Sequence, residues 1–337
     1  MRVVRCSLHD RLLNETKQAQ ARISANVRRT PLLYSHSLSE LARAEVYLKM
    51  ECWQLSGSFK IRGALSMILS LPREKRQRGL VACSSGNHGI GVSYASRLLG
   101  LPSATVFVPQ GASRTKARKM RLLGSQVMCV DGGFLTAFDA ATDFARQHGA
   151  TLVHSHAHPK IIAGQGTIGL EIAEDLPEAD MVVIPIGGGG LISGVAEALR
   201  GCSRTARIIG AEPAAAPGAY LSYGAGECRR DIHLGTSLAD GLVGTLSPLT
   251  FQASRSLVED VVVVEEDEIR SAMRMLQWHE HVTVEGAGAI GLAAIQSGRI
   301  DVKGQKVVVI VTGRNIDMDQ YVSAIKGGVC GEQLGEE

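Results

Sequence analysis

One lysine stands where its amine can do covalent chemistry. Lys60 lies in the string Gly-Ser-Phe-Lys-Ile-Arg-Gly-Ala (57–64), directly after an aromatic residue and a Ser/Gly turn, at the start of a predicted helix. Burial of an amine favours its neutral form, which is the nucleophile that forms imines with aldehydes and ketones. Because most lysines are solvated residues of amphipathic helices, the string alone does not decide between the two roles.

A polar loop further along the chain favours the chemical role. Ser-Ser-Gly-Asn-His-Gly (84–89) joins a strand predicted to end at Cys83 to a helix predicted over 90–99. Backbone N–H groups at the N-terminus of a helix bind anions, and serine and asparagine add further donors. A helix cap needs only one such residue, so the loop predicts a site for a substrate carboxylate. The predicted site comprises Ser84, Ser85, Gly86, Asn87 and His88.

A run of four glycines forms a second candidate loop. Gly187, Gly188, Gly189 and Gly190 follow the predicted strand 180–186 and precede a helix predicted over 191–200. Four glycines allow several N–H groups to converge on one phosphate at a helix N-terminus. A dinucleotide fingerprint is the rival interpretation, because Glu212 stands at the distance of a ribose-binding acid, although the third glycine of that motif is missing.

Apolar runs of strand length alternate with helical patterns over most of the chain. The runs are nearly continuous in valine and isoleucine, which is typical of parallel strands covered on both faces. This alternation predicts an α/β fold with doubly wound, open, twisted and mostly parallel sheets. The predicted strands are 45–49, 79–83, 104–108, 126–130, 151–153, 180–186, 207–211, 260–264 and 306–311. The predicted helices are 63–70, 90–99, 114–121, 135–148, 168–174 and 191–200.

The organisation between these elements is less regular. The units between 79 and 158 are predicted to form a small domain inserted into a larger one made of 1–78 and 159–337. The Ala/Gly/Pro-rich segment 212–227 is predicted to be a long loop, and the tail 327–337 is predicted to fray.

The charge balance excludes several classes of partner. The chain has 337 residues, and 36 basic against 33 acidic side chains give a net charge of +3. This balance argues against nucleic acid and anionic membranes as partners. The basic stretch 114–121 is interpreted as a solvated helix face, with a phosphate or substrate role as the alternative.

Cysteine usage and the termini indicate the compartment. The seven cysteines include no Cys-x-x-Cys pair, which is typical of a reducing cytosol rather than of a disulfide framework or zinc site. The N-terminus shows no signal-peptide pattern, and the uncharged stretch 181–196 is interrupted by Pro185 and the glycines. We therefore expect a cytoplasmic protein.

Seven short motifs occur along the chain in a definite order. They are Ser-Phe-Lys-Ile-Arg-Gly-Ala (58–64), Ser-Ser-Gly-Asn-His-Gly (84–89), Ala-Gly-Gln-Gly-Thr (163–167), Gly-Gly-Gly-Gly-Leu (187–191), Ala-Asp-Gly (239–241), Glu-Gly-Ala-Gly-Ala (285–289) and Thr-Gly-Arg-Asn (312–315). With these motifs the chain resembles the pyridoxal-phosphate enzymes of the threonine dehydratase/serine racemase family, which have fold type II.

The resemblance implies a cofactor site. In that family the lysine of Ser-Phe-Lys holds pyridoxal 5'-phosphate as an imine, which gives this role to Lys60. The glycine loop with Leu191 holds the phosphate, Asn87 meets the ring hydroxyl and Phe59 packs beside the ring. The domain 79–158 then binds substrate and the larger domain binds the cofactor.

Two further roles follow from the same resemblance. Ser85 lies across the ring from the lysine and can act there as an acid or base. Thr312 meets the pyridine nitrogen, where a neutral hydroxyl leaves that nitrogen mostly unprotonated and favours loss of a β-leaving group. Glu285 is placed either near the ring or as a structural acid.

Some positions depart from the pattern of the family. Metal-activated members supply two acids and a carbonyl where this chain has Glu212, Ala216 and Gly218, so one oxygen ligand is missing and a divalent metal is not expected. Arg314 stands where many members have glycine. The histidines of 154–158 are interpreted as a polar lining near the substrate entrance, with a transition-metal site as the alternative.

The implied activity is a carbon–oxygen lyase that converts a β-hydroxy amino acid of the threonine or serine type to a 2-oxo acid and ammonia. The alternatives are dehydration of a hydroxyectoine-derived amino acid, serine racemisation, a nicotinamide-dependent oxidoreductase, and a silent homologue that senses amino acids. The partner is a small amino acid, and the resemblance implies a homodimer or homotetramer.

Overall fold

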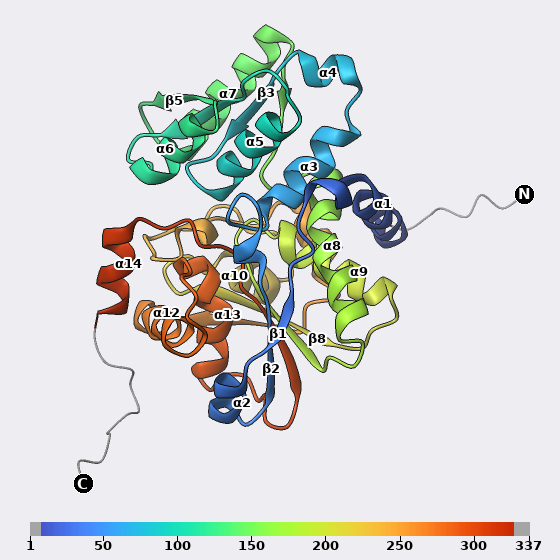
Figure 1. Ribbon diagram of the computed structural model, residues 1–337, viewed down its shortest axis with the longest axis vertical. Coiled ribbons are helices and arrows are strands. Elements are labelled where there is room, and N and C mark those ends of the chain that lie inside the picture. Colours follow the sequence, from blue (N-terminus) through green and yellow to red (C-terminus); the bar gives the residue numbers. More distant parts are fainter. Residues whose placement is uncertain (1–7, 327–337) are drawn as a thin grey trace, which may run out of the picture.

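The computed structural model describes residues 8–326 and contains two sheets of unequal size (Figure 1). The larger sheet has the strand order β1-β2-β10-β7-β8-β9, and all of its strands are parallel except β1, which pairs antiparallel with β2. Its strands are β1 (Leu32–Tyr34), β2 (Glu45–Lys49), β7 (Met181–Pro185), β8 (Arg207–Pro213), β9 (Asp260–Val264) and β10 (Lys306–Ile310).

The smaller sheet is wholly parallel and has the strand order β5-β4-β3-β6. It forms the upper part of the molecule in Figure 1. We call this sheet with its helices the small lobe, and the larger sheet with its helices the large lobe. The strands of the small lobe are β3 (Leu80–Cys83), β4 (Thr105–Pro109), β5 (Gln126–Val130) and β6 (Thr151–Leu152).

Helices connect the strands and cover the sheets. The α-helices are α1 (Leu8–Ile23), α2 (His36–Ala42), α3 (Lys60–Ser70), α4 (Arg73–Gln77), α5 (Asn87–Leu98), α6 (Arg114–Leu122), α7 (Phe134–His148), α8 (Pro159–Asp175), α9 (Gly190–Gly201), α10 (Gly218–Ala225), α11 (Pro248–Ser254), α12 (Glu266–Glu280), α13 (Gly286–Gln296) and α14 (Met318–Ile325). Short 3-10 helices are η1 (Ser24–Asn26), η2 (Glu51–Trp53) and η3 (Asp240–Leu242).

Alternation along the strands builds a core on each face of both sheets. In β10, Val307 and Val309 pack in the core that contains α12 and α13, whereas Val308 and Ile310 pack in the core that contains α8 and α9. Successive side chains of a strand point to opposite faces, so a continuous run of valine and isoleucine fits a sheet covered on both sides. In β3 the alternation repeats between a core with α3 and α5 and a core with α7.

The nine predicted strands are all present, and 45–49, 126–130 and 260–264 have the predicted limits. The α/β fold with mostly parallel sheets is therefore confirmed. The antiparallel strand β1 was not predicted, because three residues at a sheet edge give too short a pattern. The prediction of a loop over 212–227 is wrong in part, since α10 forms within it.

The tail 327–337 lies outside the described residues. Among residues 8–326, no helix is both long enough and apolar enough to cross a membrane.

Candidate active site

The candidate site lies where the carboxyl ends of strands from both lobes meet. The polar loop 84–89 follows β3, the glycine loop 187–190 follows β7, and the Thr-Gly-Arg-Asn segment 312–315 follows β10. In sheets of parallel strands, ligands bind in crevices outside these carboxyl ends. The fold therefore brings together segments that are far apart in the sequence.

Lys60 is the first residue of α3 and extends toward the linker between the lobes. Its Nζ donates a hydrogen bond of 3.3 Å to the carbonyl oxygen of Ser155 and lies 5.1 Å from the centre of the Phe59 ring. Burial lowers the pKa of this amine from 10.5 to about 8. A sizeable fraction of the amine is therefore neutral near physiological pH, as covalent or base chemistry requires.

The glycine loop is enclosed by side chains from three segments. The helix α9 begins at Gly190, and Gly189 has a φ of 82°, a left-handed conformation that suits glycine. A Cβ atom added at Gly188 would overlap the His156 ring, and one added at Gly189 would overlap Leu246 and Thr250. Only residues without side chains fit this space, and their N–H groups lie at a helix N-terminus.

The polar loop offers donors at the N-terminus of α5, which starts at Asn87. The hydroxyl of Ser84 accepts a hydrogen bond of 3.1 Å from the N–H of Gly86. The half-buried hydroxyl of Ser85 has no hydrogen-bond partner within residues 8–326. His88 is buried with its Nε2 at 2.7 Å from the Val153 carbonyl oxygen, so the group it offers to a ligand is its backbone N–H.

Asn87 takes part in a network with residues of the large lobe. Its Nδ2 donates to Glu285 Oε1 at 2.5 Å, and its Oδ1 accepts from Asn315 Nδ2 at 2.7 Å. Glu285 is fully enclosed, and burial raises the pKa of its carboxyl to about 7. A side chain at Gly313 would overlap Glu285, so the Gly of the Thr-Gly-Arg-Asn motif leaves room for this acid.

The basic helix α6 closes this network from the small lobe, which corrects one prediction. Lys116 is only 4% exposed, and its Nζ lies 2.6 Å from Asp240 Oδ2 and 3.6 Å from Glu285 Oε2. Lys119 donates to Asn315 Oδ1 at 2.5 Å. The interpretation of 114–121 as a solvated face is therefore wrong for Lys116, since sequence periodicity does not reveal a second lobe that covers the helix.

The histidine-rich segment contacts both Lys60 and the glycine loop. His154 Nδ1 accepts hydrogen bonds from the N–H groups of His156 and Ala157, and His158 Nδ1 accepts one from the N–H of Lys160. Burial lowers the pKa of His154 to about 4, so this ring is neutral near pH 7. No group of three side chains suited to a metal ion occurs in the described part of the chain.

The remaining predicted residues lie beside Lys60. Phe59 is 8% exposed and its N–H donates to the carbonyl oxygen of Thr312 at 3.1 Å. The hydroxyl of Thr312 donates to the Ala287 carbonyl oxygen at 2.9 Å. Leu191 is buried in the first turn of α9. The roles of Thr312 at a ring nitrogen and of Phe59 beside a ring stay predictions.

Comparison with known proteins decides the family. A family model described as "Pyridoxal-phosphate dependent enzyme" matches residues 23–313. The chain belongs to the pyridoxal-phosphate-dependent enzymes. The expected cofactor, the family of threonine dehydratases and serine racemases and the class of lyase are thereby confirmed, and the dinucleotide-binding interpretation of the glycine loop is set aside.

Three relatives illustrate how much of the chain is shared. A Thermotoga maritima L-threonine ammonia-lyase is 43% identical over 318 residues, which cover 94% of this chain and 79% of the relative. A catabolic L-threonine dehydratase of Escherichia coli K12 is 39% identical and covers 94% of this chain and 96% of its own. The solved structure of maize serine racemase has a TM-score of 0.87 at 36% identity, covering 93% and 96% of the two chains, which confirms fold type II.

The residues of this pyridoxal-phosphate enzyme fit the cofactor. The glycine loop packs closely against His156, Leu246 and Thr250, and its backbone lies at the start of α9, where N–H groups suit a phosphate. Lys60 supplies an amine with a lowered pKa. Ser58 Oγ is buried and has no hydrogen-bond partner among residues 8–326, so a polar group remains to be satisfied beside Phe59.

Glu212 has a different role from the metal ligand considered above. Its carboxylate accepts hydrogen bonds from the N–H groups of Ala219 at 3.0 Å and Tyr220 at 2.7 Å, at the start of α10. Burial raises the pKa of this carboxyl to about 7. Glu212 therefore stabilises the N-terminus of α10, a helix that the sequence did not predict.

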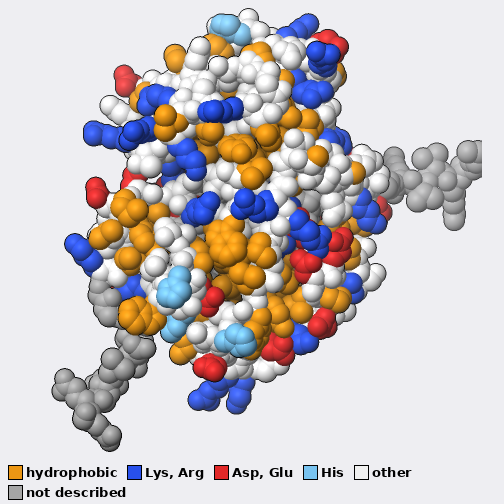
Figure 2. Space-filling model, in the orientation of Figure 1, with side chains coloured by type: hydrophobic (Ala, Val, Ile, Leu, Met, Phe, Trp, Pro, Cys, Tyr) orange, Lys and Arg blue, Asp and Glu red, His pale blue; other side chains and the backbone are white. Residues whose placement is uncertain are grey.

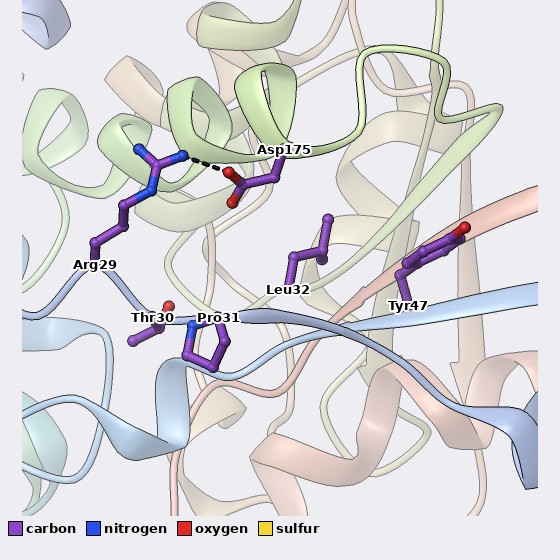
Figure 3. A pocket seen from close by; sticks show the side chains of 6 residues that line it. All are labelled: Arg29, Thr30, Pro31, Leu32, Tyr47 and Asp175. Atoms are coloured by element: carbon purple, nitrogen blue, oxygen red, sulfur yellow. Dashed lines mark hydrogen bonds and ion pairs between the residues drawn. The ribbon is translucent and has the colours of Figure 1, made fainter.

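A hollow at the edge strand β1 differs from the candidate site because its charged side chains are paired with one another. Figure 3 shows its lining, in which Arg29 forms an ion pair with Asp175, and Leu32 lies between this pair and Tyr47. Arg29 also pairs with Glu174 at 2.7 Å. Because these charges satisfy one another, this hollow offers no free reactive group.

The amine of Lys60 predicts how the cofactor-free enzyme takes up pyridoxal phosphate. Only the neutral amine attacks a carbonyl, and its fraction falls about tenfold per pH unit below the pKa of about 8. The rate of uptake should therefore rise with pH and level off above about 8. Stopped-flow absorbance between pH 6 and 9.5 measures this rate, and a rate independent of pH would contradict the assignment.

The close contact between His156 and Gly188 predicts that a side chain at position 188 weakens cofactor binding. The substitution Gly188→Ala forces the His156 ring or the loop to move, so we expect cofactor affinity to fall by roughly tenfold or more. Equilibrium dialysis of the cofactor measures the change. Gly224→Ala is the control, because an added Cβ meets nothing within 4 Å there. Equal affinities of the two variants would argue against a tight loop.

Proposed function

We propose that this enzyme dehydrates a β-hydroxy amino acid such as threonine and releases a 2-oxo acid and ammonia. The proposal rests on the lowered pKa of the Lys60 amine. Two loops at helix N-termini accompany this amine: the polar loop at the start of α5 and the glycine loop at the start of α9. Relatives over 94% of the chain are named L-threonine ammonia-lyase and L-threonine dehydratase, which supports this substrate class.

One set of residues in the candidate site binds the substrate and the cofactor, and another transfers protons. The N–H groups and hydroxyls of residues 84–88 hold the substrate carboxylate at the N-terminus of α5. The glycine loop with Leu191 would hold the cofactor phosphate, and Phe59, Asn87 and Thr312 would contact the ring. Pyridoxal phosphate supplies, when bound, an aldehyde that condenses with amines and a ring that withdraws electrons from the substrate α-carbon.

Lys60 is the proposed general base. Its Nζ accepts the α-proton of the substrate, and the carbonyl oxygen of Ser155 holds this nitrogen in place at 3.3 Å. Loss of the β-hydroxyl as water then requires one proton, which a water molecule in the site would donate. Ser85 presents a second acid or base from the small lobe.

Serine racemisation is the second candidate activity. The Ser85 hydroxyl has no hydrogen-bond partner in the described part of the chain, so it is free to exchange a proton with substrate. A relative from Arabidopsis thaliana that is 38% identical is named serine racemase. Dehydration of a hydroxyectoine-derived amino acid is the third proposal.

We also propose the organisation around the site. The small domain spans 79–158 and binds substrate, and 1–78 with 159–337 binds the cofactor. The proposed assembly is a homodimer or homotetramer, and the proposed location is the cytoplasm.

A panel of hydroxy amino acids tests the proposed substrate class. The purified enzyme should release 2-oxobutanoate and ammonia from L-threonine faster than it changes the chirality of L-serine. A coupled assay for 2-oxo acids and chiral chromatography measure the two activities. Serine isomers formed faster than any 2-oxo acid would favour the racemase, and absence of both activities with pyridoxal phosphate bound would contradict the proposed substrate class.

A further inference from the structure

A hollow on the outer side of α6 presents three arginine side chains without partners. The hollow has a volume of about 450 Å³ and is lined from α6, the end of β4 and the edge strand β5. Arg114, Arg118 and Arg121 line it, and none of their side chains forms a hydrogen bond or ion pair with residues 8–326. Figure 2 shows basic side chains gathered over this part of the small lobe.

The three arginines share one face of α6. Their spacing of four and then three residues places them in a row about 10 Å long. Lys116 and Lys119 lie on the opposite face, where they contact Asp240 and Asn315 of the large lobe. The arginine face is therefore separate from the candidate active site, although the same helix borders both.

The chemistry of the lining indicates a class of ligand. Three neighbouring guanidinium groups repel one another, and each can form paired hydrogen bonds with a carboxylate or phosphate. Val108 is 3% exposed and Ala117 is 8% exposed, so they give the hollow an apolar floor. We propose that this hollow binds a small organic anion with at least two negative charges, whose apolar part rests on Val108 and Ala117.

An exposed thiol in the wall of the hollow allows occupancy to be measured directly. Cys129 lies on β5 and lines the same space. The probes are inorganic pyrophosphate and citrate, added separately to the holoenzyme. Calorimetry measures their affinity, and peptide mass spectrometry measures how fast iodoacetamide labels Cys129.

The proposal predicts that at least one probe binds and slows the labelling of Cys129. The double variant Arg114→Gln/Arg118→Gln should weaken binding tenfold or more. The control Arg73→Gln/Arg78→Gln removes the same charge from exposed arginines of the α4 region and should bind like the wild type. Activity without added anion should stay unchanged in both double variants.

The results distinguish a phosphate-bearing from a carboxylate-bearing ligand, and they can refute the proposed anion site. Stronger binding of pyrophosphate indicates a phosphate-bearing ligand, and stronger binding of citrate indicates a carboxylate-bearing one. Absence of binding by both probes overturns the proposal. It is equally overturned if the Arg114/Arg118 variant binds like the control, or if labelling of Cys129 is unchanged at saturation.

Discussion

The substitution Lys60→Ala is expected to lower the rate of 2-oxo acid release by roughly 1,000-fold or more. Lys60 is the proposed covalent anchor and the proposed base, and its amine has a pKa of about 8 because it is buried. Lys116 and Lys119 cannot take its place, since they are engaged with acceptors of the large lobe. Steady-state assays with L-threonine measure the effect.

The control for this experiment is Lys75→Ala, which removes an exposed lysine of α4. It should retain the activity of the wild type. Circular dichroism should show both variants folded, so that a loss of activity in the first reports chemistry rather than unfolding. Activity of Lys60→Ala within about tenfold of the wild type would contradict the proposed role.

The substitution Arg62→Ala is expected to lower the free energy of unfolding more than Arg62→Lys or Arg207→Ala does. Arg62 is 1% exposed and forms hydrogen bonds of 2.7–2.9 Å with the carboxylates of Glu51 and Glu171. Removal of the guanidinium leaves the buried Glu51 carboxylate without its cation, whereas Glu171 keeps Lys49. Loss of one partner of a buried ion pair typically costs about 3–5 kcal/mol in the free energy of unfolding. Urea denaturation of the holoenzyme measures it.

Two further variants make this test specific. Arg207→Ala removes an ion pair with Glu259 on the surface, and such pairs contribute less than about 1 kcal/mol. Arg62→Lys keeps the charge and loses the forked geometry, so its stability should lie between the wild type and Arg62→Ala. A loss for Arg62→Ala no larger than that for Arg207→Ala would show that the buried network is not stabilising.

The sequence predicted those parts of the fold that depend on local pattern. The runs of valine and isoleucine in β9 and β10 predict strands without knowledge of their neighbours, so the limits of β9 agree and those of β10 differ by one residue. The helix α10 was missed because its glycines and alanines give no helical periodicity, while the buried Glu212 that caps it becomes visible only in three dimensions.

The sequence predicted the loops of the candidate site but not the hydrogen bonds and ion pairs that connect the two lobes there. Gly-rich and Ser/Asn-rich strings after strands indicate anion sites directly, so Lys60 and both loops could be named. The engagement of Asn87 with Glu285, and of Lys116 with Asp240, joins residues that are more than a hundred positions apart. Arg62 also belongs to the lysine motif, yet its contacts show that it stabilises the fold rather than the cofactor.

The most direct measurement of the central claim is to map the covalent attachment of the cofactor. The purified enzyme loaded with pyridoxal phosphate is reduced with borohydride, digested and analysed by mass spectrometry, with absorbance recorded before and after reduction. We predict that the visible absorbance disappears on reduction and that the pyridoxyl group is found on the peptide containing Lys60. A colourless enzyme that takes up no pyridoxal phosphate, or a modification on another lysine alone, would contradict the account.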